Sequence, residues 1–144
     1  MKTNFDEKNV RPGLMGIVLL SHGPLAMGAL ASAEMIYGEA DLENVVAFSL
    51  EEGDDMGEYA QSFDRVLNAY AGNCLFLIDF LGGSPCNQLR LYAMQRQVSV
   101  RALLGMNMPM LFYALDQRRC GDTAAQIEAD ALAEGRNGVR CLFD

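Results

Sequence analysis

His22, the only histidine in this sequence of 144 residues, is the side chain best suited to chemistry. It follows a short apolar run and precedes Gly23 and Pro24, which interrupt that run. An imidazole at the end of a strand can act as a nucleophile, a general base or a ligand. Asp79 also ends a short apolar run. A carboxylate that accepts the Nδ1 proton of histidine fixes the tautomer and leaves the Nε2 lone pair free to react.

A glycine-rich turn, Gly82-Gly83-Ser84, lies between the candidate carboxylate and a helical segment that begins near Pro85. Ser84 suits the N-cap position of that helix, and Pro85 suits its first turn. The free amides and the dipole of a helix N-terminus favour a bound anion. The histidine, the carboxylate and this turn are therefore the parts that a transient phosphohistidine requires.

The same residues allow two other functions. A serine hydrolase could use Ser84 or Ser21 as its nucleophile together with His22 and Asp79, although Ser84 lies in GGSPC rather than in a GxSxG motif. A non-catalytic regulatory or ligand-binding module could keep the same fold without any reaction. Labelling with a phosphoryl donor distinguishes these functions, because only a phosphoryl carrier takes up acid-labile label.

Short apolar runs that could position these side chains recur along the chain. Five of them have the length of strands: 14–21, 45–50, 75–79, 98–104 and, near the end, 139–143. Segments of helical periodicity lie between or after them: 26–37, 56–70, 85–95, a short one from Pro109, and 123–134. The alternation predicts an α/β fold of three layers, with helices on both faces of a doubly wound, mainly parallel sheet.

The order of the strands decides whether the candidate side chains meet. If the first four strands lie in the order 2-1-3-4, the loops after the first and third strands flank the point where the strand order reverses. Ligands of such sheets bind at that point, beyond the carboxyl ends of the strands. We therefore expect His22 and the loop 79–84 to share one crevice.

Composition and charge exclude several classes of protein. The chain has 51% apolar residues, enough for one domain with a sizeable core. Its 11 basic and 19 acidic residues give a net charge of −8 without a basic stripe, which argues against nucleic-acid binding. No apolar run approaches the roughly 20 residues of a membrane span. The polar lead-in, residues 1–13, lacks the apolar core of a signal peptide and has no evident role.

The four cysteines are widely spaced and follow no metal-ligand pattern. A domain of this size does not need disulfides, so reduced thiols in a cytoplasmic protein are expected. The single histidine excludes a multi-histidine metal site, and the sequence predicts neither a metal nor a cofactor.

Four segments resemble the mannose-type enzyme IIA domains of the bacterial phosphoenolpyruvate-dependent sugar phosphotransferase system. They are GIVLLSHGPLAMG at 16–28, AEMIYG at 33–38, DFLGGSPCN at 79–87 and GMNMPM at 105–110. Cys86 departs from the family, which usually has phenylalanine before the asparagine. The similarity covers about residues 14 to 115 in the correct order, and it implies that 14–144 form a single IIA domain.

By this resemblance, His22 accepts a phosphoryl group from the histidine-containing phosphocarrier protein. It then passes the group to a IIB component, which acts in sugar uptake with the membrane components IIC and IID. Asp79 matches the carboxylate that hydrogen-bonds the active histidine. The family fold has four parallel strands and one antiparallel strand, here 139–143, which is exchanged between the subunits of a homodimer.

Overall fold

A computed structural model describes residues 1–143, and Asp144, the last residue of the expected domain, lies outside them. The sheet has five strands in the order β1-β3-β2-β4-β5. Their bounds are β1 Lys2–Thr3, β2 Gly16–His22, β3 Val45–Leu50, β4 Cys74–Ile78 and β5 Arg101–Leu104. The strands β2 to β5 are parallel, so the predicted order 2-1-3-4 is confirmed for the four expected strands.

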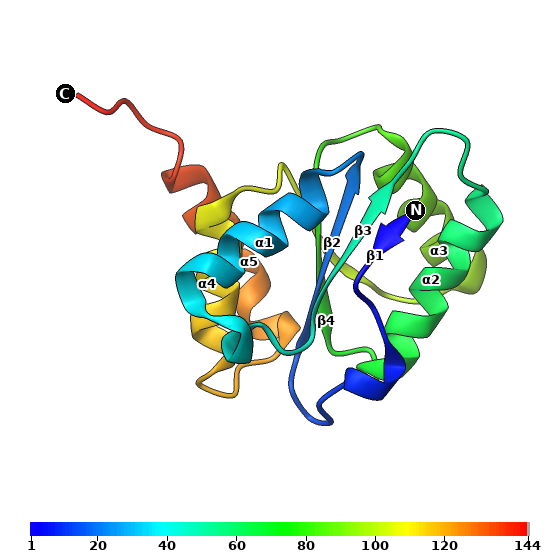
Figure 1. The fold of residues 1–144 in the computed structure, drawn as a ribbon, viewed down its shortest axis with the longest axis horizontal. Coiled ribbons are helices and arrows are strands. Elements are labelled where there is room, and N and C mark those ends of the chain that lie inside the picture. The colour runs from blue at the N-terminus through cyan, green and yellow to red at the C-terminus, as the bar shows by residue number, and fades with distance from the viewer. Residues whose placement is uncertain (144) are drawn as a thin grey trace.

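Helices cover both faces of the sheet (Figure 1), which confirms the three-layer architecture. The five α-helices and two short 3-10 helices are α1 Leu25–Tyr37, α2 Met56–Ala69, α3 Ser84–Arg96, α4 Met108–Arg118, α5 Ala124–Asn137, η1 Glu7–Asn9 and η2 Glu39–Leu42. Helices α1, α4 and α5 share one apolar core with the sheet, and α2 and α3 share the other. Within residues 1–143, no helix is both long and apolar enough to cross a membrane.

The central strands β2 and β4 bring the two candidate loops together. Leu20 of β2 is in register with Ile78 of β4, the last residue of that strand. The backbone N–H of Asp79 then donates to the Leu20 carbonyl over 3.1 Å, which continues the pairing by one residue. His22 is the last residue of β2, and the two candidate side chains therefore leave the sheet at the same edge.

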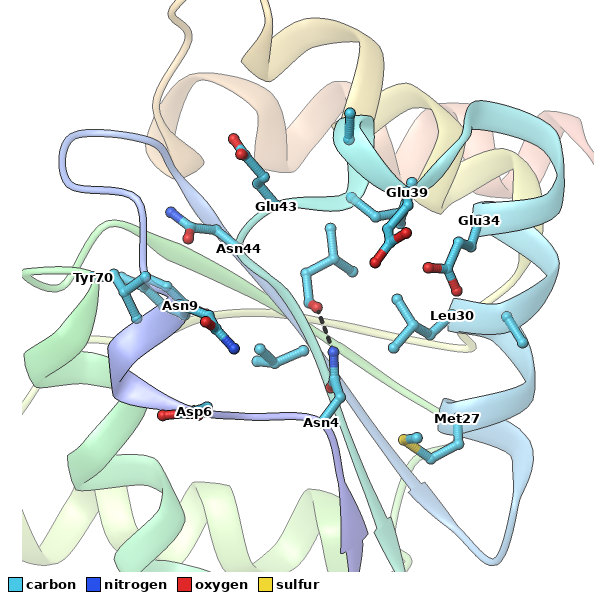
Figure 2. Close-up of a pocket in the computed structure, with 16 residues that line it drawn as sticks. Asn4, Asp6, Asn9, Met27, Leu30, Glu34, Glu39, Glu43, Asn44 and Tyr70 are labelled. Atoms are coloured by element: carbon cyan, nitrogen blue, oxygen red, sulfur yellow. Dashed lines mark hydrogen bonds between the residues drawn. The ribbon is translucent and has the colours of Figure 1, made fainter.

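The N-terminal segment, to which the sequence analysis assigned no role, closes one edge of the sheet. Thr3 pairs with Phe48 in the only antiparallel strand pair of residues 1–143. Beyond β1, the amide side chain of Asn4 continues the pairing. It donates to the Val45 carbonyl over 3.1 Å (Figure 2), and it accepts from the Ala47 N–H over 2.8 Å. Phe5 is buried in the core that α2 and α3 cover. These contacts occupy backbone groups of β3 that would otherwise form an open edge.

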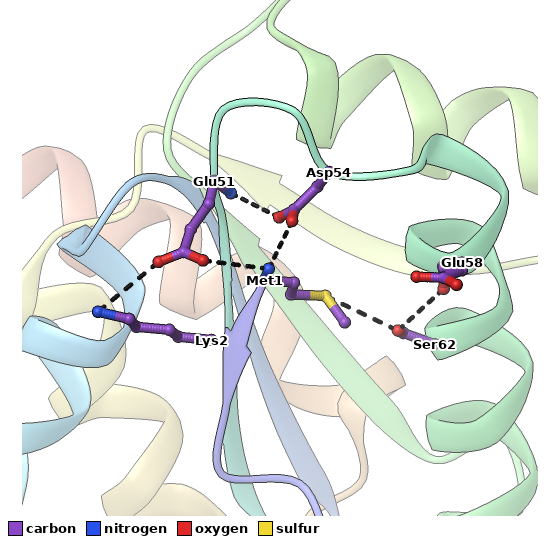
Figure 3. Close-up of polar contacts among 6 residues, drawn as sticks. All are labelled: Met1, Lys2, Glu51, Asp54, Glu58 and Ser62. Atoms are coloured by element: carbon purple, nitrogen blue, oxygen red, sulfur yellow. Dashed lines mark hydrogen bonds and ion pairs between the residues drawn. The ribbon is translucent and has the colours of Figure 1, made fainter.

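The first residue also holds the loop that follows β3. The Met1 amine lies 2.6 Å from a carboxylate oxygen of Asp54 and 3.3 Å from one of Glu51 (Figure 3). The hydrogen bond from this amine lowers the pKa of Asp54, and the same contact raises the pKa of the amine. The loop adjoins the candidate site, because the carbonyl of Leu50 accepts from the N–H of Gly23 over 2.6 Å.

The C-terminal segment differs from the expectation for a strand. Residues 139–143 form no strand in the single chain, and the antiparallel strand of the sheet is β1 instead. The segment leads away from α5 and from the body of the domain (Figure 1). Val139, Leu142 and Phe143 are 79%, 88% and 86% exposed. A segment this short is stable as a strand only when it pairs with a sheet edge, and it pairs with none among residues 1–143.

Candidate active site

A short hydrogen bond joins the two candidate side chains, His22 and Asp79. His22 Nδ1 lies 2.7 Å from Asp79 Oδ2, and the same oxygen accepts the backbone N–H of His22 over 2.9 Å. The other oxygen, Oδ1, accepts the N–H of Phe80 over 2.8 Å. The Asp79 side chain is 7% exposed, whereas that of His22 is 43% exposed. A carboxylate can only accept, so the ring proton is assigned to Nδ1 and Nε2 keeps its lone pair.

Gly83 lies against the reactive edge of the imidazole. A Cβ atom at this position would lie 2.5 Å from His22 Cε1 and 3.2 Å from Nε2. Any side chain larger than hydrogen would therefore displace the ring. Gly83 is also the N-cap residue of α3, with φ −77° and ψ 170°. The expectation that Ser84 is the N-cap is wrong by one residue: the close approach to His22 leaves room only for glycine there, and Ser84 is the first helical residue.

The N-terminus of α3 offers a site for an anion next to Nε2. The first-turn amides of a helix have no partner within the helix, and here Ser84 and Cys86 carry such amides whereas Pro85 has none. The turn is held by Asn87, whose side chain donates to the carbonyl of Gly82 over 2.8 Å. The first turn of α3 contains no acidic residue. The expected cradle thus adjoins the histidine, and its position suits a phosphoryl group on Nε2.

An aromatic residue that the sequence pattern did not indicate also contacts the histidine. The ring of Phe80 stacks on the His22 ring, with 5.1 Å between the centroids and 18° between the planes. Phe80 is 53% exposed. The available sequence signal was that Phe80 directly follows Asp79. Aromatic side chains in strand-to-helix loops point in many directions, so the stacking of Phe80 on His22 was not predictable.

His22 borders a mostly apolar groove of about 710 Å³ between the N-termini of α1 and α4. Pro24, Leu25, Met106 and Met108 contribute to its walls. Asn107 fixes this end of α4: its side chain caps Met110 N–H over 3.0 Å and donates to the carbonyl of Gly135 over 2.9 Å. The methionine-rich segment therefore builds a wall of the groove that His22 borders.

A second groove, of about 690 Å³, lies between α1 and the N-terminal segment (Figure 2). It contains neither His22 nor Asp79, and four carboxylates contribute to its lining: Asp6, Glu34, Glu39 and Glu43. Like charges repel, so this groove is unsuited to a phosphoryl group. The part of the chain described by the structure holds no group of three His, Cys, Asp or Glu side chains arranged to bind a metal ion.

The serines do not form a hydrolase triad with the histidine. Ser21 is fully buried, and its hydroxyl accepts the N–H of Ala26 over 2.7 Å at the start of α1. Ser84 is exposed on the first turn of α3. Among residues 1–143, no hydrogen bond joins His22 to either serine. Neither serine is thus activated by the histidine, and Nε2 of His22 is left without a hydrogen-bond partner among the described residues.

The domain is a doubly wound α/β sheet covered by helices on both faces. Its crevice holds a histidine that a carboxylate orients beside the N-terminus of a helix. A family model described as "PTS system fructose IIA component" (EIIA-man) matches residues 16–132. The chain therefore belongs to the mannose/fructose family of IIA components of the phosphotransferase system.

Curated relatives from two organisms support this assignment. Over 134 residues, the chain is 30% identical to the "PTS system mannose-specific EIIAB component" of Escherichia coli K12, a match that covers 89% of this chain. The chain spans only 39% of that relative's length. It is also 28% identical over 102 residues to the "PTS system sorbose-specific EIIA component" of Klebsiella pneumoniae, covering 70% of this chain and 73% of the relative.

Solved structures show the same fold. The mannose/sorbose-specific IIA subunit of Enterococcus faecalis superposes with a TM-score of 0.72 at 28% identity, covering 90% of this chain and 95% of that one. The EIIA component of Streptococcus agalactiae gives a TM-score of 0.79 at 23% identity, with coverage of 89% and 97%. The latter likeness concerns the fold alone.

Proposed function

We propose that this protein is a phosphoryl carrier of a sugar phosphotransferase system, with His22 as the residue that is phosphorylated. The observation that carries the proposal is the 2.7 Å contact between His22 Nδ1 and Asp79, which leaves the Nε2 lone pair free next to Gly83, the N-cap of α3. The phosphoryl donor is the histidine-containing phosphocarrier protein, and the acceptor is a IIB component that serves sugar uptake with IIC and IID.

The transfer needs one bond to form and one to break. The Nε2 lone pair attacks the phosphorus of the donor phosphohistidine, the donor's N–P bond breaks, and its electron pair returns to the donor nitrogen. The Nδ1 proton stays in its hydrogen bond to Asp79, so the His22 ring gains positive charge that the carboxylate stabilises. The turn Gly82-Gly83-Ser84 presents backbone amides and the helix dipole to the phosphoryl oxygens.

The other parts of the proposal follow from the same assignment. Residues 14–144 form a single IIA domain, to which the lead-in 1–13 adds the edge strand β1. The four cysteines are unpaired, as suits the reducing cytoplasm where the phosphocarrier protein would meet this chain. The relatives' names mention mannose and sorbose, and we extend to this chain only the class of substrate system, a sugar transporter.

The experiment combines the full chain with labelled phosphoenolpyruvate and the two general phosphotransferase proteins, followed by a IIB component as a chase. A carrier takes up acid-labile label and loses it to IIB. A regulatory module takes up no label. Label that is acid-stable, as on a serine, would contradict the proposal.

Replacement of Gly83 by alanine is expected to lower the phosphorylation rate roughly 10- to 100-fold, because its new methyl group would push the His22 ring away from the cradle. Gly83 has an ordinary negative φ, so the backbone itself accepts alanine. The rate is measured with phosphoramidate, a small phosphoryl donor. Gly28→Ala is the matched control, because its methyl group would meet nothing within 4 Å. Equal rates for Gly83→Ala and the parent would show that the ring does not depend on this contact.

A homodimer that exchanges the C-terminal segment is part of the proposal. The sheet ends at β5, which has no neighbour on its outer side among the described residues, and residues 139–143 present exposed apolar side chains. We propose that the segment of one copy pairs with the β5 edge of the other. This arrangement would bury side chains that the single chain leaves in water.

Deletion of residues 138–144 is therefore expected to weaken dimerisation by roughly 100-fold or more, since each buried apolar side chain contributes about 1.5–3 kcal/mol. Sedimentation equilibrium of the full and truncated chains measures the effect. Arg140→Ala, which keeps every apolar side chain of the segment, serves as the control. A monomeric full-length protein at micromolar concentration, or an equally tight truncated dimer, would refute the exchange.

A further inference from the structure

Phe80 occupies a position that core packing does not explain. Its side chain is 53% exposed and contributes to neither of the two apolar cores. An exposed aromatic ring is normally free to choose among several rotamers. Here the ring lies nearly parallel to the imidazole of His22, at 5.1 Å between centroids. This is the only aromatic pair that Phe80 forms among residues 1–143, and its partner is the candidate reactive side chain, which makes Phe80 a candidate for a role in the reaction.

Two further contacts fix this stack. The backbone N–H of Phe80 donates to Asp79 Oδ1 over 2.8 Å, so Phe80 is anchored to the carboxylate that also holds the histidine. At the other end, the tip of the ring meets the N-cap of α3: a Cβ on Gly83 would lie 2.8 Å from Phe80 Cζ. The ring thus lies between the carboxylate and the start of the helix, nearly parallel to the imidazole.

The charge of the imidazole changes during the proposed reaction. With a proton on Nδ1 and a phosphoryl group on Nε2, the ring is an imidazolium. Asp79 meets that charge only at the Nδ1 edge. A cation within about 6 Å of an aromatic centroid is attracted to the ring face. The centroid of the Phe80 ring lies 5.1 Å from that of the His22 ring, within this distance. No other aromatic ring of residues 1–143 stacks on the imidazole.

We propose that Phe80 is a positioning residue of the carrier that stabilises phosphorylated His22 by stacking on its cationic ring. This inference rests on the proposed function. It assigns the orientation of the histidine to two groups, the Asp79 carboxylate at the edge of the ring and the Phe80 ring at its face. The stabilisation favours the phosphorylated form over the free form, and it belongs to this chain rather than to a complex with a partner.

The test is the equilibrium constant for phosphoryl exchange between the phosphocarrier protein and this chain. An equilibrium between the free proteins does not depend on contacts made only in their complex. Phe80→Leu should lower the constant about 2- to 30-fold, the range expected for loss of a cation–π contact. Phe80→Tyr keeps the aromatic face and should restore it. Leu81→Ala, a change at an exposed neighbour, is the control that should leave the constant unchanged.

The outcomes separate this inference from the function on which it rests. The melting temperature of Phe80→Leu should match that of the parent, because the ring lies outside both cores. An unchanged equilibrium constant for Phe80→Leu overturns the inference while the carrier function stands. The inference is also overturned, and the carrier function again stands, if Phe80→Leu lowers only the rate of transfer from the phosphocarrier protein and leaves the equilibrium constant unchanged. Phe80 would then be a contact for the partner. A parent chain that accepts no phosphoryl group overturns both.

Discussion

The His22→Ala variant is expected to accept no phosphoryl group, from either the phosphocarrier protein or phosphoramidate. His22 is the only histidine of the chain, and its Nε2 is the ring nitrogen that the Asp79 contact leaves unprotonated beside the N-cap of α3. Gel or mass analysis of the labelled chain gives the result directly. Label on the variant at the parental level would remove His22 from the mechanism.

The fold of this variant should survive, which makes the loss interpretable. The imidazole is 43% exposed, and Asp79 keeps the backbone N–H groups of residues 22 and 80 as donors after the ring is removed. We expect the free energy of unfolding to fall by about 1 kcal/mol, the contribution of one hydrogen bond. A variant that fails to fold would instead show that the histidine is a structural residue.

The Asp79→Asn variant is expected to transfer phosphoryl groups roughly 10²- to 10⁴-fold more slowly. The two carboxylate oxygens accept three N–H groups, and an amide cannot replace both oxygens as acceptors. If the new NH₂ faces His22, it donates to Nδ1 and moves the ring proton to Nε2, where it blocks attack. If it faces the N–H of Phe80, two donors oppose each other in a buried place.

Either orientation should also cost stability, about 1–3 kcal/mol for the unsatisfied buried donor. The rate is measured with phosphoramidate and the stability by urea unfolding. Asp55→Asn is the matched control, because asparagine caps a helix as well as aspartate does and Asp55 is the N-cap of α2. A parental transfer rate in Asp79→Asn would show that the carboxylate does not orient the histidine.

The meeting of His22 with Asp79 was predictable from the sequence only under the assumed strand order 2-1-3-4, which the structure confirms. Each lies at the end of an apolar run that is long enough for a strand, and the carboxyl ends of neighbouring parallel strands lie at one edge. The local pattern therefore places each residue at the carboxyl end of a strand, whereas the order that makes these two strands neighbours had to be assumed. The capping box of Thr123 and Gln126 at the start of α5 was predictable for the same reason, because it depends on residues close in sequence.

The features that escaped prediction depend on contacts between distant residues or on a single rotamer. β1 has only two residues, and Asn4 pairs with Val45, 41 positions away, so no local pattern marks the N-terminal edge strand. Gly83 rather than Ser84 is the N-cap of α3, because the His22 ring at the end of β2 leaves no room for a side chain at position 83. The stacking of Phe80 on His22 likewise joins two loops that only the folded sheet brings together.

The position of the phosphoryl group on the chain tests the central claim most directly. The full chain, with its histidine ring labelled with ¹⁵N, is phosphorylated through phosphoenolpyruvate and the two general phosphotransferase proteins and then observed by ³¹P and ¹⁵N NMR at alkaline pH. The hydrogen bond from Nδ1 to Asp79 predicts a single phosphoryl group on Nε2 of His22, lost on acid treatment. A phosphoryl group on Nδ1, one on a serine, or none at all would contradict the account.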